Sequence, residues 1–488
     1  MARRNRRQFL QDSMFATAAA AMASSTGRYA TAQDQPASKS PNERLNVACV
    51  GVKGRGGSHI SAWAAKPDTM VTYVVDVDSK IGNGRVDEIE KRQGVRPKLV
   101  DDIRDVLEDK SVDIISVATP NHWHSLMAIW AMQAGKDVYV EKPVSHNVSE
   151  GRRAVETARK YKRICQTGTQ CRSNPGMRQL IEYVQSGKIG AVKVARGLCY
   201  KPRGSIGAKG TYEVPASVNY DLWCGPARML PVTRPQFHYD WHWIWEYGNG
   251  DLGNQGIHQM DIARWGLGVN ELCKSTFSYG GRLGYEDAGE TANTQVCVHD
   301  FGDKSLVFEV RGLRTDRYKG AGVGVIFECT EGYAVSPSYN GGTVFDKEGK
   351  EIARFSEGED KYHFANFLAA VRTRKLTDLN ADIEEGHLSS ALCHLGNISY
   401  RLGSPVAANA VEKSLADLKT TDNAKDTLER TLAHLKDNRV DLASARLTVG
   451  PVLPFDPKSE TFPGNEAANK MLTREYRAPY TVPAAGQV

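Results

Sequence analysis

Short apolar runs alternate with helical patterns over the first third of the chain. Each run ends in glycine or in a polar residue, and the runs occupy residues 45–52, 70–75, 112–118 and 138–140. Such runs are typical of strands that are buried on both faces of a parallel sheet. A further short strand is expected at 164–167, and helical patterns occupy residues 58–65, 122–134 and 149–161. This alternation predicts βαβ units, in which ligands bind beyond the carboxyl ends of the strands.

The pattern changes after about residue 190, where short β-prone runs alternate with glycine turns. These runs lie at residues 192–195, 305–310, 324–329 and 342–345. They predict an open, mostly antiparallel sheet. Helical periodicity recurs at residues 256–267, 362–372, 384–402 and 426–436. The expected fold class is therefore α/β, with a parallel-sheet domain first and an α+β domain after it.

A glycine-rich loop follows the first apolar run and reads GVKGRG from Gly51 to Gly56. The fingerprint of dinucleotide-binding Rossmann domains is G-x-G-x-x-G. Gly51 and Gly56 fit its first and third positions, and Lys53 occupies the second. Gly54, one residue later, is expected to provide the close backbone approach. The helix that follows offers N–H groups to a pyrophosphate, and Lys53 or Arg55 is expected to add a phosphate contact.

An acidic residue, Asp76, ends the second apolar run, 25 residues after Gly51. In Rossmann domains an acid about 20 residues after the glycine loop accepts hydrogen bonds from the adenosine ribose. A carboxylate there repels a 2′-phosphate, so the sequence favours NAD over NADP. The alternative is that Asp76 only ends a strand.

Three later motifs identify a family resemblance. They are Thr119-Pro120-Asn121-His122-Trp123-His124, Glu141-Lys142-Pro143 and Asn254-Gln255-Gly256-Ile257-His258-Gln259-Met260-Asp261. Together, over roughly residues 45 to 400, they resemble the glucose–fructose oxidoreductase, inositol dehydrogenase and rhizopine-catabolism family (Gfo/Idh/MocA). The resemblance implies hydride transfer between NAD(P) and a secondary hydroxyl of a sugar, polyol or cyclitol.

The resemblance also implies the catalytic residues. Lys142 matches the family's catalytic lysine, which hydrogen-bonds the reacting oxygen, and Pro143 stands where the family often has a cis peptide. His258 matches the general base. Family members usually have Asp where this chain has Asn254, and an amide cannot stabilise an imidazolium as a carboxylate does. Either His258 works with a lower pKa, or another acid such as Asp251 or Asp261 compensates, or the chemistry has changed.

The strand-end motifs supply the remaining cofactor contacts that the resemblance implies. The residues expected to contact the cofactor, beside those of the glycine loop and Asp76, are Thr119, Pro120, Asn121, His124, Glu141 and Lys142. His124 is placed near the nicotinamide.

An aromatic run, FHYDWHWIWEY from Phe237 to Tyr247, is the candidate substrate segment. Aromatic faces beside hydrogen-bond donors suit sugar rings, and Tyr239, Trp241 and His242 are the residues expected to contact a carbohydrate. Arg172 and Asn254 are further candidates. The alternative is aromatic packing beneath the helix that carries His258.

The first 32 residues resemble a twin-arginine export signal. The pair Arg6-Arg7 precedes a short Ala-rich apolar stretch, and Ala30-Thr31-Ala32 offers a cleavage site. The apolar stretch is shorter than the roughly 20 residues of a membrane span, so no stable anchor is expected. We therefore expect export to the periplasm. Five of the arginines behind the net charge of +6 lie in this leader, so the charge does not indicate a nucleic-acid partner.

The nine cysteines are scattered and form no CxxC pair. Several lie in apolar runs, so they are interpreted as buried small hydrophobic residues rather than metal ligands or disulfides. No metal site is expected.

These patterns divide the chain into five parts. The expected parts are a signal peptide (1–32), a linker (33–44), a Rossmann NAD(P)-binding domain (45–170), a substrate and oligomerisation α+β domain (171–449) and an extended tail (450–488). A homo-oligomer through the C-terminal sheet is expected from the resemblance.

Three functions remain open at this stage. The first is net oxidation or reduction of a sugar, polyol or cyclitol. The second is a glycosidase or lyase in which a held NAD⁺ oxidises the sugar transiently and no net redox occurs. The third is a sugar- or nucleotide-binding module without turnover.

Overall fold

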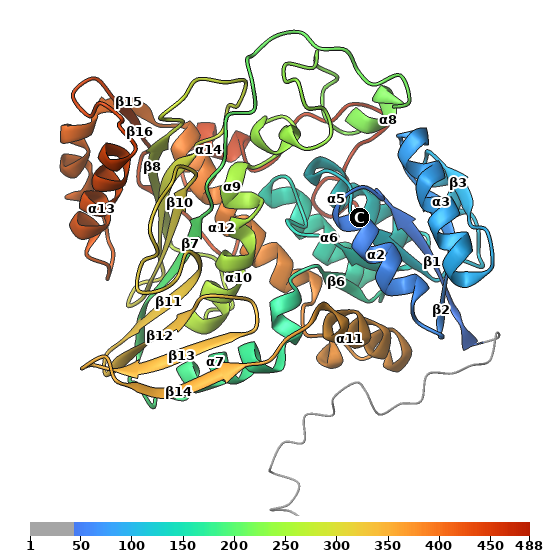
Figure 1. The fold of residues 1–488 in the computed structure, drawn as a ribbon, viewed down its shortest axis with the longest axis horizontal. Helices are drawn as coiled ribbons and strands as arrows, with labels where there is room; N and C mark the ends of the chain where they lie inside the picture. The colour runs from blue at the N-terminus through green and yellow to red at the C-terminus, as the bar shows by residue number, and fades with distance from the viewer. Residues whose placement is uncertain (1–42) are drawn as a thin grey trace, which may run out of the picture. The chain divides into compact units, whose positions relative to one another are not determined.

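A computed structural model describes residues 43–488. The expected export signal and most of the expected linker lie outside the described residues. Figure 1 shows the parallel sheet, the larger second sheet and the helices around them. In residues 43–488, no helix is both long and apolar enough to span a membrane.

The first domain is built on a six-stranded sheet with the order β3-β2-β1-β4-β5-β6, in which every pair is parallel. This is the strand order of the Rossmann fold. Its strands are β1 (Leu45–Val50), β2 (Thr69–Val75), β3 (Lys98–Val100), β4 (Ile114–Val117), β5 (Asp137–Val140) and β6 (Cys165–Thr167). Its helices are α2 (Arg55–Ala64), α3 (Ser79–Gln93), α4 (Arg104–Leu107), α5 (Asn121–Gln133) and α6 (Val148–Lys160).

Helices cover both faces of this sheet. Along β1, Ala48 and Val50 pack in one apolar cluster with α5 and α6. Val47 and Cys49, which point to the other face, pack with α2, α3 and the later helix α11 (Asp360–Thr373). Burial on both faces explains why β1 and β4 are continuous apolar runs.

The second domain is an eleven-stranded sheet with the order β14-β13-β12-β11-β7-β10-β9-β8-β16-β15, and β17 pairs with β8. Only β7 and β10 are parallel; the other pairs are antiparallel. The central strands are β7 (Val192–Tyr200), β8 (Ser275–Gly281), β9 (Thr294–Asp300), β10 (Ser305–Arg311) and β11 (Val323–Cys329). The outer strands are β12 (Gly332–Ser336), β13 (Gly341–Asp346), β14 (Glu351–Ser356), β15 (Ser404–Ala407), β16 (Arg446–Val449) and β17 (Leu453–Pro454). Both predicted sheet types are confirmed.

Further helices connect and cover these strands. The α-helices are α7 (Pro175–Gln185), α8 (Tyr220–Cys224), α9 (Gly250–Gly253), α10 (Gly256–Leu267), α12 (Ile383–Arg401), α13 (Ala424–Asp437) and α14 (Glu466–Lys470). The 3₁₀ helices are η2 (Gln170–Ser173), η3 (Asp240–Trp243), η4 (Leu376–Asp378) and η5 (Ala408–Leu415).

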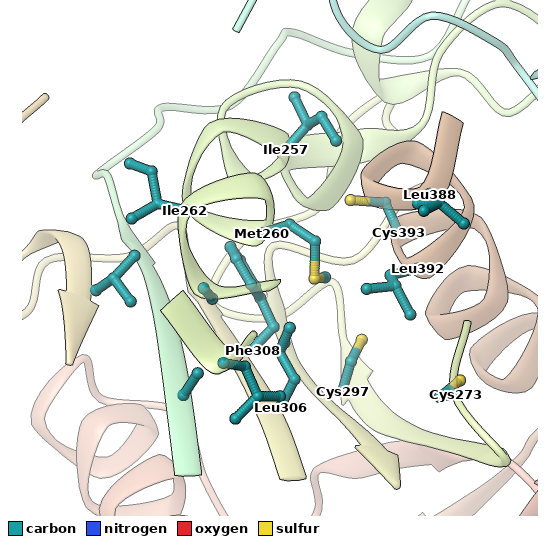
Figure 2. Packing of buried hydrophobic residues seen from close by; sticks show 14 of the residues in the cluster. Ile257, Met260, Ile262, Cys273, Cys297, Leu306, Phe308, Leu388, Leu392 and Cys393 are labelled. Atoms are coloured by element: carbon teal, nitrogen blue, oxygen red, sulfur yellow. The ribbon is translucent and has the colours of Figure 1, made fainter. Parts of the chain in front are cut away.

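One face of the second sheet packs on the helices that carry the candidate site. Leu306 and Phe308 of β10 belong to the same buried cluster as Met260 of α10 and Leu392 of α12 (Figure 2). The neighbouring residue Val307 points to the opposite face, as strand alternation requires, and packs with α13.

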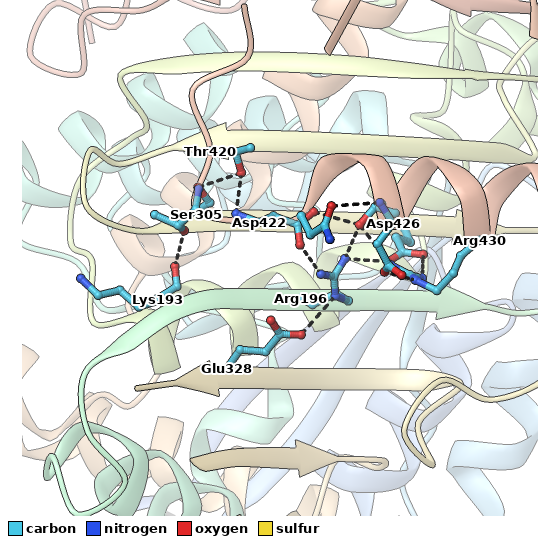
Figure 3. Close-up of polar contacts among 12 residues, drawn as sticks. Lys193, Arg196, Ser305, Glu328, Thr420, Asp422, Asp426 and Arg430 are labelled. Atoms are coloured by element: carbon cyan, nitrogen blue, oxygen red, sulfur yellow. Dashed lines mark hydrogen bonds and ion pairs between the residues drawn. The ribbon is translucent and has the colours of Figure 1, made fainter. Parts of the chain in front are cut away.

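Buried ion pairs hold α13 on that opposite face. Arg196 of β7 and Arg430 of α13 each donate a 2.9 Å hydrogen bond to the buried Glu309 of β10, and Arg196 also pairs with Asp422 (Figure 3). Burial alone would raise the pKa of Glu309, but Arg196 and Arg430 lower it to about 2. The pairs therefore bring α13 and two strands together around one carboxylate.

The C-terminal tail contacts both domains. Leu453 pairs with Thr276 of β8, and Tyr480 and Val482 pack in the cluster that covers α5 of the Rossmann sheet. All nine cysteines are free; eight are buried and Cys329 is half-buried. Their interpretation as buried small residues is confirmed.

Candidate functional site

The glycine loop has a shape that only glycine allows. Gly51 has φ +74°, and a Cβ atom there would lie 2.8 Å from Thr119 at the end of β4. A Cβ on Gly56 would lie 1.8 Å from the carbonyl oxygen of Gly51. Gly54 has φ +55°, and no atom lies within 4 Å of the position of its missing Cβ. The loop therefore leaves open space where a dinucleotide fingerprint needs it.

The start of α2 is free to bind an anion. Gly54 is its N-cap residue, no side chain accepts a hydrogen bond from its first N–H groups, and its first turn contains no acidic residue. The N–H groups of Gly56 and Gly57 donate to the carbonyls of Lys53 and Gly54 at 3.1 and 3.0 Å within the turn, so the helix dipole is what favours a phosphate at this end. Lys53 is exposed beside this helix start. The loop thus fits the pyrophosphate of NAD.

Asp76 is fixed beside the glycine loop. One carboxylate oxygen accepts a 2.8 Å hydrogen bond from the Val52 N–H, and the other accepts a 2.9 Å bond from the Asp78 N–H. Burial raises the pKa of Asp76, and these two N–H donors oppose the rise. Each oxygen keeps a lone pair, so the carboxylate can still accept from ribose hydroxyls. Asp76 therefore ties the end of β2 to the loop, which is more than ending a strand.

Glu141 and Arg55 bind each other. The buried Glu141 accepts hydrogen bonds from Arg55 Nε at 2.9 Å, His59 Nε2 at 3.2 Å and Gln170 Nε2 at 3.2 Å. Burial would raise the pKa of Glu141, but His59 and Arg55 hold it well below its usual range. Arg55 also donates to Asp360 at 2.7 Å. This pairing directs Arg55 toward Glu141 and Asp360, so Lys53 is the freer candidate for a phosphate.

His124 joins two strand ends. Its ring nitrogens lie 2.7 Å from the carbonyl oxygen of Thr119 and 2.6 Å from that of Pro143. Asn121 donates to the side-chain oxygen of Asn249 at 2.9 Å. Both side chains are buried and engaged with the protein itself. We conclude that His124 and Asn121 position the loops after β4 and β5, and that Thr119 and Pro120, which are half-buried, form the surface there.

Lys142 follows the end of β5, and its peptide bond to Pro143 is cis. Its amine donates a 2.8 Å hydrogen bond to the main-chain carbonyl of Asn254, at the end of α9. Burial lowers the pKa of Lys142, and the neighbouring Glu141 opposes that shift. The Lys142 amine of the first domain therefore contacts the segment that precedes α10.

His258 lies in the first turn of α10 and is half-buried. Its ring centre is 5.0 Å from that of Tyr339. Burial, and next the positive charge of Lys142, lower its pKa well below the usual histidine value. Lys142 and His258, from segments far apart in the sequence, therefore converge on one site.

No carboxylate supports His258. Its Nδ1 atom is buried and has no hydrogen-bond partner within residues 43–488. Asn254 lies between α9 and α10 rather than in the same helix as His258. Its main-chain carbonyl accepts from Lys142, and its main-chain N–H donates to the Gly250 carbonyl. Asp261 binds Arg172 and Ser389, while Asp251 binds Arg203. Neither acid compensates for the absent partner, so the lower-pKa alternative fits the geometry best.

Arg172 is engaged away from the reacting groups. Its guanidinium makes a bidentate contact with Asp261 at 2.8–3.0 Å and pairs with Glu385 at 3.0 Å. The side chain is only 6% exposed. The structure therefore gives Arg172 a role in fixing α10 and does not bring it to Lys142 and His258.

The aromatic run is divided between packing and exposure. Trp241 is buried, and its indole N–H donates to the carbonyl of His238 at 2.8 Å, which favours the packing alternative for this residue. Tyr239 is 43% exposed. His242 is half-buried, and burial lowers its pKa to about 3. Tyr239 and His242 remain available to a ligand.

Two residues that the sequence patterns missed, Lys201 and Tyr339, join this site through Gln255 of the family motif. Lys201, directly after β7, donates to Gln255 at 3.0 Å, and Gln255 donates to the hydroxyl of Tyr339 at 2.5 Å. Burial raises the pKa of Tyr339 to about 12. A polar residue at a strand end was the available signal for Lys201, whereas nothing local marks Tyr339.

The described chain contains no group of three or more His, Cys, Asp or Glu side chains placed to hold a metal ion.

Comparisons with known proteins place this site in a family. Residues 45–169 match the profile described as "Oxidoreductase family, NAD-binding Rossmann fold", and residues 192–288 match "Oxidoreductase family, C-terminal alpha/beta domain". The scyllo-inositol 2-dehydrogenase (NAD(+)) of Bacillus subtilis is 32% identical over 337 residues, which cover 66% of this chain and 85% of that protein.

Other relatives match in part. A glycosyl hydrolase family 109 protein of Saccharopolyspora erythraea is 29% identical over 43% of this chain, and the match spans only 42% of that protein's own length. The family 109 proteins of Shewanella baltica are matched over 27% of theirs. Levoglucosan dehydrogenase of Pseudarthrobacter phenanthrenivorans is 24% identical over 48% of this chain and 54% of that protein.

Solved structures agree with the fold. The WlbA dehydrogenase of Bordetella pertussis, solved with NADH and UDP-GlcNAcA, superposes with a TM-score of 0.56 at 19% identity, covering 73% of this chain and 97% of that one. Together with the Rossmann sheet, the glycine loop, Lys142 and His258, the profile matches and the Bacillus relative show that this chain belongs to the Gfo/Idh/MocA family of NAD-binding oxidoreductases.

Proposed function

We propose that this protein is an NAD-dependent oxidoreductase that acts on a secondary hydroxyl of a sugar, polyol or cyclitol. The observation that carries the proposal is the hydrogen bond from the Lys142 amine to the main-chain carbonyl of Asn254. This bond brings the amine, which follows β5, close to the helix start that carries His258. The names of the Bacillus and Pseudarthrobacter relatives support this substrate class.

Alcohol oxidation requires a hydride acceptor, a group that stabilises the substrate oxygen and a base for the hydroxyl proton. NAD⁺, when bound, accepts the hydride of the reacting carbon. Lys142 uses one of its three N–H groups on Asn254, so two remain to bind the substrate oxygen and stabilise its developing negative charge. His258, neutral because of its lowered pKa, accepts the hydroxyl proton. Lys201, Tyr239 and His242 are the groups proposed to bind other hydroxyls.

The test is turnover with NAD⁺ and a panel of sugars, polyols and cyclitols, followed by absorbance of the reduced nicotinamide. Lys142→Ala is expected to lower kcat/KM at least about a hundredfold, the order of loss for one charge-stabilising donor. Lys347→Ala, which removes an exposed lysine paired with Glu331, is the matched control. The proposal fails if no substrate, and no keto sugar in the reverse direction, shows turnover that depends on Lys142.

The family 109 glycosyl hydrolase relatives favour a second candidate. In it the sugar would be oxidised transiently, the acidified neighbouring C–H would lose its proton to a base, and the aglycone would leave with a proton. Water would then add to the resulting double bond in a hydrolase, but not in a lyase, and the hydride would return to the keto carbon. Asn254, in place of the usual acid beside His258, also motivates it. Release of an aglycone from a chromogenic glycoside without accumulation of reduced nicotinamide would separate it from the first candidate. Unchanged sugar after long incubation would instead favour a binding module.

We also propose that the protein is exported to the periplasm through the twin-arginine route. The motif Arg6-Arg7 followed by an apolar stretch supports this. Replacement of both arginines by lysine is expected to leave the protein in the cytoplasmic fraction.

A homo-oligomer through the part of the second sheet that α13 leaves uncovered is likewise proposed, and sedimentation equilibrium tests it.

A further inference from the structure

A cavity of about 280 Å³ lies beside the loop that follows β5, and we call it the tail cavity. Its wall is formed mainly by residues 146–147 of that loop, residues 245–249 before α9, the second half of α12 and residues 470–475 of the tail. The parts from α12 and the tail lie outside the two stretches that match the family profiles. No residue that the proposed function assigns to NAD or to the reacting sugar lines this cavity. The tail cavity is therefore separate from the site described above.

His146 supplies an unpaired hydrogen-bond donor to the wall of the tail cavity. Its Nδ1 atom lies 3.4 Å from Nη1 of Arg474, which can only donate, so Nδ1 accepts and the neutral ring carries its proton on Nε2. Burial, and next the charge of Arg474, hold the pKa of His146 well below its usual value, so the ring is neutral. The Nε2 atom is buried and has no partner among residues 43–488. An acceptor from outside the chain would remove the cost of this unpaired N–H.

His394 of α12 adds a second unpaired nitrogen to the same wall. The side chain is only 3% exposed, and its Nε2 atom lies 3.1 Å from the hydroxyl oxygen of Ser145. Its Nδ1 atom is buried and has no partner in the described part of the chain. Two imidazole nitrogens, one from the loop after β5 and one from α12, therefore lack partners around one cavity.

Basic side chains outnumber acidic ones in the lining of the tail cavity. The basic residues are Arg228, Arg401, Lys470 and Arg474, and the acidic ones are Glu246 and Glu475. Arg228 and Arg474 both pair with Glu246. The cavity therefore keeps a net positive charge, which favours an anionic ligand.

Arg401 is the arginine of this lining that is left for a ligand. It makes no ion pair with residues 43–488, although the charges of Glu290 and Glu246 act on it from farther away. Its guanidinium lies over the ring of Trp245, 4.9 Å from the ring centre. A guanidinium that stacks on an indole keeps its N–H groups at its edge, where they match the two oxygens of a carboxylate. Arg401 can therefore bind one carboxylate in bidentate fashion.

We propose that the tail cavity binds a small hydroxylated carboxylate such as a sugar acid, with its carboxylate on Arg401 and its hydroxyl oxygens on His146 and His394. The volume lies near the lower end of the roughly 300–1,000 Å³ of small-molecule pockets, so it suits a molecule of this size and not a dinucleotide. Hydroxyl groups suit the two imidazoles, because a hydroxyl can both accept and donate a hydrogen bond. The inference goes beyond the proposed function and does not depend on it.

The test is titration calorimetry of the full-length protein with glucuronate, gluconate and malate. Glucose, which lacks the carboxylate of glucuronate, is the uncharged comparison and is expected not to bind this cavity. Arg401→Ala is expected to weaken binding of the acid at least about tenfold, the order for a hydrogen bond to a charged group. Lys470→Glu reverses an exposed charge of the lining and is expected to weaken binding as well. Arg354→Ala, which removes an exposed arginine of β14, is the matched control.

Three outcomes would overturn the proposal. They are no binding of any of the three acids, equal affinities in the native and Arg401→Ala proteins, and binding that Lys142→Ala abolishes while Arg401→Ala retains it, which would place the acid in the site of Lys142. Thermal unfolding shows whether Arg401→Ala is folded, and Lys470→Glu decides the question if it is not. Because no turnover is measured, a negative result leaves the proposed function untouched.

Discussion

The Lys142 amine donates to the main-chain carbonyl of Asn254 at 2.8 Å, and this bond joins the Rossmann domain to the segment that precedes His258. Lys142 lies just beyond the end of β5, and the break between α9 and α10 leaves the Asn254 carbonyl free to accept its hydrogen bond. Under the proposed function, this bond between segments 112 residues apart would let Lys142 and His258 act on the same hydroxyl.

The first prediction concerns the pH dependence of this pair. The base must be neutral and the amine must be charged for alcohol oxidation. Burial lowers the pKa of both groups, His258 from 6.5 and Lys142 from 10.5. We expect a bell-shaped profile of kcat/KM with an acidic limb below pH 6.5 and a basic limb below pH 10.5. An acidic limb at or above the ordinary histidine pKa would show that His258 is not the base.

The second prediction concerns Asn254. Asn254→Asp places a negative charge beside Lys142 and near His258, which favours the protonated form of each. Both limbs of the kcat/KM profile should move to higher pH, the acidic one by roughly one unit. Asn254→Ser, which adds no charge, should leave the limbs in place. Unmoved limbs in Asn254→Asp would mean that this side chain has no electrostatic access to the reacting groups.

Sequence patterns predicted the fold where burial is continuous. The strands β1 and β4 lie inside the predicted apolar runs because both their faces are covered. The helix α3 was not predicted, since its 15 residues bury only Gly82, Val86 and Ile89 and leave little periodicity. The strands β8 and β9 were missed as well, because their polar residues are buried in the sheet and mask the alternation.

The site was predictable only in part, for a related reason. Lys142 and His258 stand in recognisable motifs, so their positions follow from the sequence. The roles of His124 and Arg172 depend on partners that no local pattern identifies, such as Asp261, which is 89 residues from Arg172. The contact between His238 and Asp78 spans 160 residues. The sequence thus identified side chains with suitable chemistry, but it did not identify the distant residues that bind those side chains.

The third prediction tests the glycine loop. Gly51→Ala puts a methyl group 2.8 Å from Thr119 on a backbone with φ +74°. We expect a loss of about 1–3 kcal/mol in the free energy of unfolding and loss of NAD binding, measured by urea denaturation and calorimetry. Gly54→Ala carries the backbone strain but meets no atom within 4 Å. Gly54→Ala should therefore lower the free energy of unfolding less than Gly51→Ala. Equal losses in the two variants would show that the positive φ, and not the contact with Thr119, causes the loss.

The fourth prediction concerns cofactor choice. Asp76→Ser removes the carboxylate that faces the ribose and leaves the N–H groups of Val52 and Asp78 with a weaker acceptor. Affinity for NAD should fall about tenfold to a hundredfold, the worth of hydrogen bonds to a charged group. Affinity for NADP should fall less, since a repulsive charge is lost too. Titration calorimetry with both cofactors checks this, and an unchanged NAD/NADP ratio would contradict the assignment of Asp76.

The last prediction concerns the buried carboxylate that holds α13. Glu309 has a folded pKa of about 2 against an ordinary value of 4.5, because Arg196 and Arg430 outweigh the effect of burial. A depressed carboxyl pKa stabilises the fold above pH 4.5 and loses that contribution as the pH falls toward 2. The contribution amounts to roughly 3 kcal/mol at neutral pH. Glu309→Gln should therefore lower the free energy of unfolding at pH 7 by about 3–5 kcal/mol, since Arg196, Arg311 and Arg430 each lose one carboxylate partner. It should also flatten the acid dependence of stability between pH 4.5 and 2.

Glu351→Gln, which breaks an exposed pair with Arg354, is the control and should leave the urea midpoint unchanged. A Glu309→Gln protein as stable as the native one would show that these ion pairs only match the cost of burying them.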